Sequence, residues 1–141
     1  MRNYFLVKIK YEKTAEEGKI VKITEVYLVD ALSFTECEAR IITEMQPFIS
    51  GEFEVVSIAK YKLAETFLGN GDRYFRSKVS YIALDEEKGV EKKIGFFMLV
   101  QADDLNQAES NLQLGMKGSM ADYRIESITE TKIIDIFNYE A

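Results

Sequence analysis

The sequence predicts a single α+β domain, residues 1–141, in which a ββαβ-type repeat occurs twice, at about 4–67 and 74–137. Residues 4–11 (YFLVKIKY) return as residues 74–81 (YFRSKVSY). In each half, the hydrophobic period changes from that of strands to that of a helix and back again. We therefore expect an antiparallel sheet with two helices packed on one side, and a pseudo-twofold axis between the two repeats.

Two strands joined by a short turn open the first repeat. Apolar and polar side chains alternate through residues 4–12, as in a strand with one buried face. Residues 14–18 end in Gly18 and form a turn, and residues 19–30 form a second strand that is rich in β-branched and aromatic side chains at its end. The short, glycine-containing connection predicts a β-hairpin.

The hydrophobic period becomes helical at Ser33. Ser33 and Glu36 have the spacing of a capping box, whose side chains accept hydrogen bonds from free backbone amides at a helix start. The apolar stripe of this helix consists of Phe34, Cys37, Ile41 and Met45. Pro47 ends the helix. Residues 53–67 then form one long bent strand or two short ones, and because the alternation slips near Ser57 we expect a β-bulge there.

The second repeat keeps this order of elements. It contains a strand, a turn and a strand at residues 74–82, 85–89 and 90–101. A helix begins at Asp104, where Gln107 completes a spacing that resembles the capping box. Its apolar stripe, with the internal spacing of the first helix, consists of Leu105, Ala108, Leu112 and Met116. Residues 123–137 form the closing strand.

The composition excludes several functional classes. A net charge of -6 and a sequence pI near 4.8 argue against a protein that coats nucleic acid with its whole surface, although a local basic face remains compatible. The chain has no histidine, so Ser-His-Asp and Cys-His arrangements and histidine-containing zinc sites cannot be built. Walker and dinucleotide glycine patterns are also missing from the sequence. We therefore expect no enzymatic activity and no cofactor.

The sequence also predicts a location. One cysteine, Cys37, cannot form an internal disulfide, and the N-terminus lacks the pattern of a signal peptide. The longest apolar-rich run, residues 94–100, is far shorter than the roughly 20 residues that a membrane-spanning helix needs. We expect a cytoplasmic protein that does not enter a membrane.

Cysteine and acidic residues offer three candidate sites. Cys37 lies on an apolar helix stripe and corresponds to Ala108, which predicts a small buried core residue. The acidic turns lack the alternating oxygen ligands of a calcium loop, so we expect solvated turns and no metal site. Glu65 and Asp135 each lie two positions before a phenylalanine. Near a pseudo-twofold axis they would form a coupled pair with a raised pKa; exposed strand-end acids would give the same pattern.

The main candidate binding surface is the outward face of the first and last strands. Both repeats keep tyrosine and lysine there at matching positions: Tyr4, Lys8, Lys62, Tyr74, Lys78 and Lys132. Lys10 and Arg76 add positive charge. Aromatic rings stack on bases and cations follow a phosphate backbone, as in proteins that bind single-stranded nucleic acid. An ordinary solvated sheet face, or a face for another anionic or protein ligand, would contain the same residue types.

The second strand of the second repeat is apolar on both faces at residues 96–100 (FFMLV). Such a run is either the buried centre of a sheet or an edge covered by a partner subunit, and the latter would make the protein a homodimer. Apolar strands together with an acidic net charge also suit a protein-interaction adaptor or an inhibitor of a host protein. We rank single-stranded nucleic-acid binding without catalysis first and this protein-interaction role second.

Three phrases of the sequence are long enough to be specific: residues 27–36 (YLVDALSFTE), 50–55 (SGEFEV) and 115–123 (GMKGSMADY). Through them, almost the whole chain resembles a family of short uncharacterised proteins of gut bacteria and their phages, domain of unknown function 4494. The resemblance implies a cytoplasmic protein carried by phage or other mobile DNA, and it brings no catalytic residues. By association it implies a small accessory factor in phage DNA metabolism or host takeover.

Overall fold

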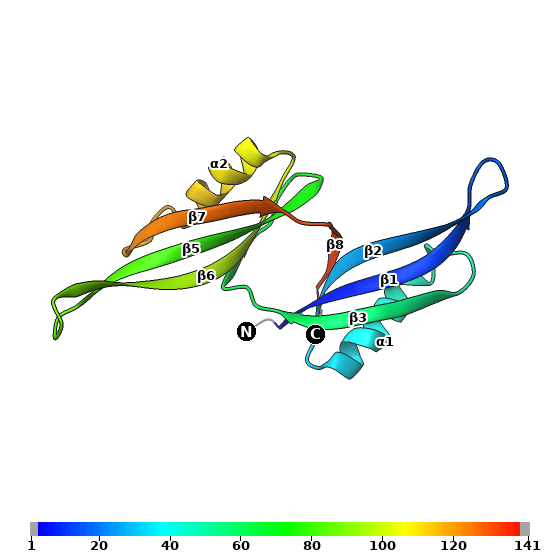
Figure 1. The fold of residues 1–141 in the computed structure, drawn as a ribbon, viewed down its shortest axis with the longest axis horizontal. Helices are drawn as coiled ribbons and strands as arrows, with labels where there is room; N and C mark the ends of the chain where they lie inside the picture. The colour runs from blue at the N-terminus through cyan, green and yellow to red at the C-terminus, as the bar shows by residue number, and fades with distance from the viewer. Residues whose placement is uncertain (1–2, 139–141) are drawn as a thin grey trace. The chain divides into compact units, whose positions relative to one another are not determined.

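The computed structural model describes residues 3–138, and the chain divides into two compact units (Figure 1). Unit 1 combines the residues up to Lys62 with those from Lys132 onward, and unit 2 comprises Leu63–Thr131. The elements of unit 1 are β1 (Tyr4–Thr14), β2 (Ile20–Asp30), α1 (Phe34–Met45), β3 (Phe53–Tyr61) and β8 (Ile133–Phe137). The elements of unit 2 are β4 (Glu65–Phe67), β5 (Arg73–Asp85), β6 (Val90–Ala102), α2 (Leu105–Met116) and β7 (Asp122–Glu130).

Each unit contains a four-stranded sheet of mixed direction, with the order β3-β1-β2-β8 in unit 1 and β4-β6-β5-β7 in unit 2. In both sheets a long antiparallel hairpin is flanked by an antiparallel strand on one side and by a short parallel strand on the other. The predicted α+β class is confirmed. The prediction of a single antiparallel sheet with two helices on one side is wrong, because there are two sheets and each has its own helix.

The closing segment of each predicted repeat is divided between the two units. The structure breaks residues 53–67 into β3 and β4, and residues 123–137 into β7 and β8. β4 pairs with β6, and β8 pairs with β2, so each closing segment ends in the sheet of the other unit. Hydrophobic alternation shows which residues share a strand face, but it does not encode which strand becomes the neighbour. That is why the sequence did not reveal the exchange.

β-Bulges occur at matching positions in the two sheets. In unit 1 the register between β1 and β3 shifts between Lys8 and Ile9, which leaves Val56 without an opposite residue. This bulge adjoins Ser57 and confirms the predicted one. The same shift between β5 and β7 leaves Glu126 as the extra residue in unit 2. An extra residue bends the strand and redirects the side chains around it.

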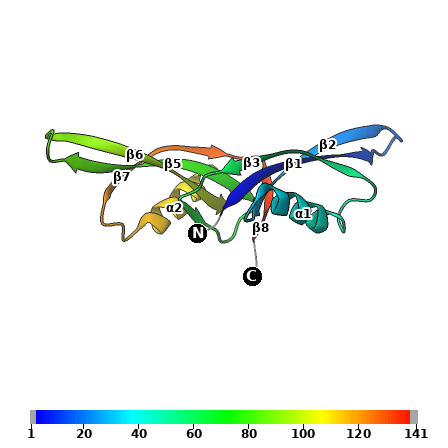
Figure 2. The same ribbon diagram turned by 90° about the horizontal axis from the view of Figure 1, so that it is seen from below.

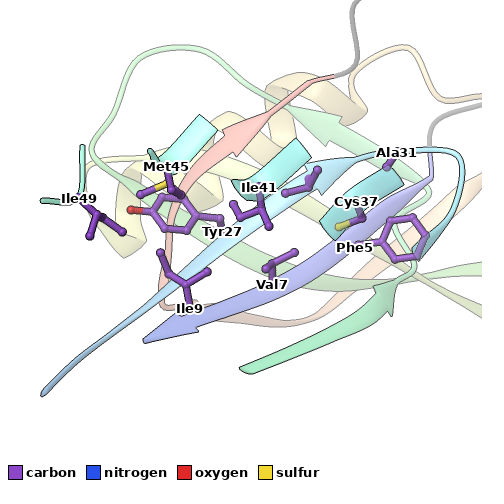
Figure 3. Close-up of a cluster of buried hydrophobic side chains, with 10 residues drawn as sticks. Phe5, Val7, Ile9, Tyr27, Ala31, Cys37, Ile41, Met45 and Ile49 are labelled. Carbon is purple, nitrogen blue, oxygen red and sulfur yellow. The ribbon is translucent and has the colours of Figure 1, made fainter. Parts of the chain in front are cut away.

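The core of unit 1 lies between its sheet and α1 (Figure 3). The helix begins where predicted, because Ser33 Oγ accepts a hydrogen bond from the Glu36 N–H at 3.1 Å. The helix is also linked to the segment after β8, because the Arg40 guanidinium donates a hydrogen bond to the carbonyl of Asn138. The buried core residues are Phe5, Val7, Ile9, Tyr27, Val29, Ala31, Cys37, Ile41, Met45 and Ile49. The predicted burial of Cys37 is confirmed.

The core of unit 2 repeats this arrangement with α2. Asp104 Oδ1 accepts from the Gln107 N–H at 2.8 Å, while Gln107 Oε1 accepts from the Asp103 N–H at 2.6 Å, so the predicted cap forms in a reciprocal version. The buried core residues are Phe75, Val79, Met98, Val100, Ala102, Ala108, Leu112 and Met116. Gly115 allows β4 to approach α2, since a Cβ there would lie 2.5 Å from the Phe67 ring. Glycine therefore makes room for the exchanged strand.

Each sheet has one face covered by its helix and one helix-free face (Figure 2). In unit 2 the residues that alternate along β5 toward the helix-free face begin with Tyr74, Arg76 and Lys78. In unit 1 the equivalent residues of β1 begin with Tyr4, Leu6 and Lys8. The helix-free faces are where the predicted tyrosine and lysine residues of these two strands lie.

Candidate ligand-binding face

The structure places the predicted lysines in two kinds of position. Lys8 and Lys78 are exposed on the first strand of their hairpins, on the helix-free faces. Lys62 and Lys132 are also exposed, but they lie in the short connections that follow β3 and β7. The lysines therefore do not form one row along a strand, and only Lys8 and Lys78 occupy matched sites in the middle of a sheet face.

The expected solvent exposure of Tyr4 and Tyr74 is wrong. Their exposed fractions are only 6% and 7%. Alternation assigns a side chain to a face, but not every part of a helix-free face is open. At this end of the sheets the neighbouring Leu28 and Leu99, which also point to the helix-free faces, are fully buried. These tyrosines are therefore packed, and base stacking on the helix-free faces needs another aromatic ring.

Phe97 supplies an exposed aromatic ring on the helix-free face of unit 2. It lies directly across from Lys78 in the β5–β6 ladder and is 37% exposed. The guanidinium carbon of Arg76 lies 3.9 Å from the centre of the Phe97 ring, in a cation–π arrangement. The Lys78 side chain extends over Gly95, where a Cβ would lie only 3.1 Å from Lys78 Cε. We call the set Arg76, Lys78, Lys93, Phe97 and Arg124 the basic aromatic face.

Lys93 and Arg124 extend this positive surface on the neighbouring strands. Both are exposed, and Arg124 of β7 lies opposite Ser80 of β5. Lys93 Nζ lies 3.8 Å from Glu126 Oε1, a half-exposed pair of small energetic value. Sequence reasoning included Arg76 but missed Phe97, Lys93 and Arg124. Counting the hairpin register back from the predicted turn at 85–89 would have placed Phe97 beside Lys78.

Charge is concentrated on this hairpin. Residues 76–82 (RSKVSYI) and 91–97 (EKKIGFF) contain four cations and one acid, a local charge of +4 − 1 = +3 in a chain of net charge -6. The cations are Arg76, Lys78, Lys92 and Lys93, and the acid is Glu91. Such a local field attracts an anionic ligand even though the whole protein is acidic.

The predicted acidic pair, Glu65 and Asp135, is divided between the two units. Glu65 belongs to unit 2 and Asp135 to unit 1, and both are exposed. Asp135 Oδ1 accepts a hydrogen bond from the Ile136 N–H at 2.8 Å. Within residues 3–138, no three histidine, cysteine or carboxylate side chains gather closely enough to hold a metal ion. Two shallow hollows beside β3, of about 650 and 560 Å³, share Glu52 in their lining, and the first is also lined by Lys10 and Lys22.

The titratable groups with clear shifts belong to the core side of unit 1. Burial, followed by the charges of Glu36 and Glu38, raises the pKa of the Cys37 thiol to about 11. Burial and the Glu25 carboxylate, which accepts a hydrogen bond from the Tyr27 hydroxyl at 3.1 Å, raise the pKa of Tyr27. Both groups stay neutral near pH 7, so this cluster is built as core rather than as a reactive centre.

A family model described as Domain of unknown function (DUF4494) matches residues 3–139. The chain belongs to this family. The match spans both units, so the DUF4494 domain includes both exchanged strands. No curated protein and no solved structure matches the chain. Among the described residues of this DUF4494 protein, no helix has the length and apolar character needed to cross a membrane.

Proposed function

We propose that this protein is a non-enzymatic binding module that holds single-stranded nucleic acid on the basic aromatic face of unit 2. The observation that carries the proposal is the exposed Phe97 ring, bordered by Arg76 at 3.9 Å and by Lys78 across the ladder. An aromatic ring among cations on a sheet face combines base stacking with phosphate contact. The ring takes over the stacking role that the sequence assigned to Tyr4 and Tyr74.

The residues of this face have separable roles in the proposed complex. Bases stack on the platform formed by the Phe97 ring and the planar Arg76 guanidinium. Lys78, Lys93 and Arg124 contact phosphates along the strand, since their charged groups reach solvent from three neighbouring strands. Stacking and phosphate contact carry little sequence information, so the proposed binding is largely independent of base sequence.

The origin of the fold belongs to the same proposal. We infer an internal duplication, supported by the same element order in both sheets and by bulges at Lys8/Ile9 and Lys78/Val79. From the family resemblance we also propose a phage or mobile-element accessory role and a cytoplasmic location. A duplication would explain why the two units share one framework.

The proposal is tested by fluorescence anisotropy with a labelled single-stranded oligothymidylate across a salt series. We expect binding that weakens with salt. The double variant Lys78→Glu/Arg124→Glu should lower the magnitude of the log K against log salt slope by at least about 1.4, because two phosphate contacts are lost. The matched control is Lys8→Glu/Lys10→Glu on the helix-free face of unit 1, which should leave binding close to that of wild type.

Two outcomes would contradict the proposal. One is wild-type protein at micromolar concentration that shows no salt-sensitive binding. The other is a control variant that weakens binding as much as the unit 2 variant does, which would assign the effect to general charge. Thermal unfolding monitored by circular dichroism checks that both double variants fold.

A second function, that of a protein-interaction adaptor or inhibitor, is favoured by a different observation. Ile94 and Phe96 of β6 are 43% and 39% exposed, although they point to the helix-covered side of the sheet. Large apolar side chains exposed beside one another on a strand are typical of interaction surfaces. This observation concerns the edge of unit 2 rather than its helix-free face.

A further inference from the structure

The first half of β6 forms an open edge of the unit 2 sheet. β4 is its neighbour on that side, but β4 pairs only with Met98–Val100. In the described part of the chain, no strand pairs with residues 90–97 on the side away from β5 (Figure 1). β4 is therefore too short to cover the whole edge of β6. The β4–β6 ladder stops in the middle of β6, a 13-residue strand.

The backbone groups along this edge are oriented for another strand. The Phe97 carbonyl faces the β4 side, since it accepts a hydrogen bond from the Ala64 N–H at 2.7 Å. Successive residues of a strand direct their backbone N–H and C=O groups to opposite sides. The backbone N–H and C=O groups of Glu91, Lys93 and Gly95 therefore point away from β5, in the same direction as those of Phe97. A strand placed there would extend the ladder that β4 starts.

The side chains beside the edge offer apolar contacts on both faces. Ile94 and Phe96 border the helix-covered side, where Phe96 is held edge-to-face by Tyr81 at 5.4 Å between ring centres. Phe97 borders the helix-free side. Gly95 between them has no side chain to obstruct a close backbone. An added strand would find one ring on each face, Phe96 on the helix-covered side and Phe97 on the helix-free side. Apolar side chains of the partner that pack on these rings would give the strand addition its specificity.

Charge decides what kind of strand fits. Lys92 and Lys93 lie at the centre of the open edge, with Glu91 as the only acid of residues 90–97. Lysines on an edge oppose pairing with a second copy of the same edge, because antiparallel self-pairing brings like charges together. The same lysines attract carboxylates. We propose that residues 91–97 of β6 accept an extended, acidic segment of a partner protein as an added strand.

Unit 1 provides a natural contrast to this edge. β8 pairs with β2 at Val26–Val29, and within residues 3–138 no strand covers the beginning of β2 on that side. At the position equivalent to Phe96, however, unit 1 has Glu25, whose carboxylate is bonded to Tyr27. An acidic strand would meet a negative charge there instead of a ring. The β2 edge is therefore a matched control for the β6 edge.

The experiment starts from a phage-displayed library of short random peptides, selected on the full-length protein. Enriched peptides should combine apolar residues with Asp or Glu, because each face of the edge offers both a ring and a lysine. A synthetic fluorescein-labelled copy of the most enriched peptide is then titrated by anisotropy. Lys93→Pro removes one outward N–H without touching the β5 ladder, and we expect at least tenfold weaker binding. Lys93→Ala keeps the backbone N–H, so its peptide affinity should fall less than that of Lys93→Pro. Lys22→Pro, the matched change in unit 1, should leave binding unchanged.

A second variant covers the case in which Lys93→Pro does not fold. Phe96→Glu copies the residue of unit 1 onto an exposed site, and it should also weaken peptide binding at least tenfold while leaving the circular dichroism spectrum unchanged. Backbone amide shifts in ¹⁵N spectra, concentrated at Glu91, Lys93 and Gly95 on peptide addition, would support strand addition directly.

Four results would overturn the inference. The first is a selection that enriches no acidic peptides, and the second is a Lys22→Pro variant whose peptide affinity falls as much as that of Lys93→Pro. The third is peptide binding that is abolished by Lys78→Glu but unaffected by Lys93→Pro. The fourth is a wild-type dimer in sedimentation that Lys93→Pro converts to monomer, which would assign the edge to a second copy of the chain. Because oligonucleotide binding is measured on the separate variants at Lys78 and Arg124, failure of either proposal leaves the other distinguishable.

Discussion

The two helix-free faces have the same framework but different side chains at matching positions. Across from Lys78 lies Phe97, which is 37% exposed, whereas across from Lys8 lies Val26, which is 7% exposed. The position of Arg76 corresponds to Leu6 in unit 1, and that of Arg124 corresponds to Glu54. At these three positions unit 2 has an exposed ring and two cations, where unit 1 has two apolar side chains and one acid.

This difference shows that two units with the same order of elements can present different surfaces. Both sheets keep the hairpin, the bulge, the helix cap and the short parallel strand. These features serve folding, and they are similar in both units. The exposed ring and its cations are found in unit 2, and a binding site must be argued from such residues rather than from the framework.

The largest expected effect tests which unit each exchanged strand stabilises. The Phe137 ring stacks on Tyr27 at 5.4 Å between ring centres, and Phe67 packs against α2. Phe137→Ala should destabilise unit 1, and Phe67→Ala should destabilise unit 2, each by about 3 kcal/mol. Native-state hydrogen exchange, followed separately in β2 and β6, measures both. Faster exchange in β1 and β2 on Phe67→Ala, with β6 unchanged, would contradict the strand exchange.

Alkaline pH should distinguish the units next. The Cys37 thiol has a pKa raised from 9.0 to about 11, so its stabilising contribution is complete below pH 9 and is lost as pH rises toward 11. The loss amounts to roughly 2 to 3 kcal/mol. The raised pKa of Tyr27 acts in the same direction. Unit 2 has Ala108 and Met98 at these positions, and neither side chain ionises. Unit 2 should therefore keep its stability at alkaline pH.

Hydrogen exchange of the two units in a series of alkaline buffers checks this order of unfolding. Cys37→Ala, which copies the residue of unit 2, should remove the thiol's share of the pH dependence. Unit 2 opening before unit 1 would show that the buried thiol and phenol do not set alkaline stability.

A smaller effect is expected where α2 meets β4. Gly115→Ala should destabilise unit 2 by about 1 to 2 kcal/mol, since the new methyl group would lie 2.5 Å from the Phe67 ring. Without that contact, alanine would instead stabilise the helix by roughly 1 kcal/mol. Urea unfolding measures whether Gly115→Ala lowers or raises the free energy of unfolding. Glu44→Ala, at the matched site of α1, should change stability by less than about 0.5 kcal/mol.

The smallest expected effect separates stacking from folding. Phe97→Ala should weaken oligothymidylate binding at least fivefold, because one stacked base is worth about 1 to 3 kcal/mol. Val26→Ala, its match in unit 1, should lower the free energy of unfolding but leave the dissociation constant unchanged, since Val26 is buried. Equal losses of binding in the two variants would remove the distinction between the faces.

Local sequence patterns predicted much of this fold for identifiable reasons. The caps at Ser33 and Asp104, the bulge near Ser57 and the burial of Cys37 all follow from spacing along one segment. The strand exchange depends on long-range pairing, which the same patterns do not contain. Tyr4 and Tyr74 were placed on the right face, but their burial depends on what surrounds that part of the face. The sequence did not indicate a role for Phe97, because residues 96–100 are apolar on both faces of the strand.

The central claim, that unit 2 binds single-stranded nucleic acid and unit 1 does not, is tested most directly by NMR. Unlabelled oligothymidylate is titrated into ¹⁵N-labelled protein, and amide shifts are mapped onto the two sheets. We predict that the largest shifts fall at Arg76, Lys78 and Phe97, with little change at Leu6, Lys8 and Val26. Shifts of equal size on both faces, or largest shifts in unit 1, would contradict the account.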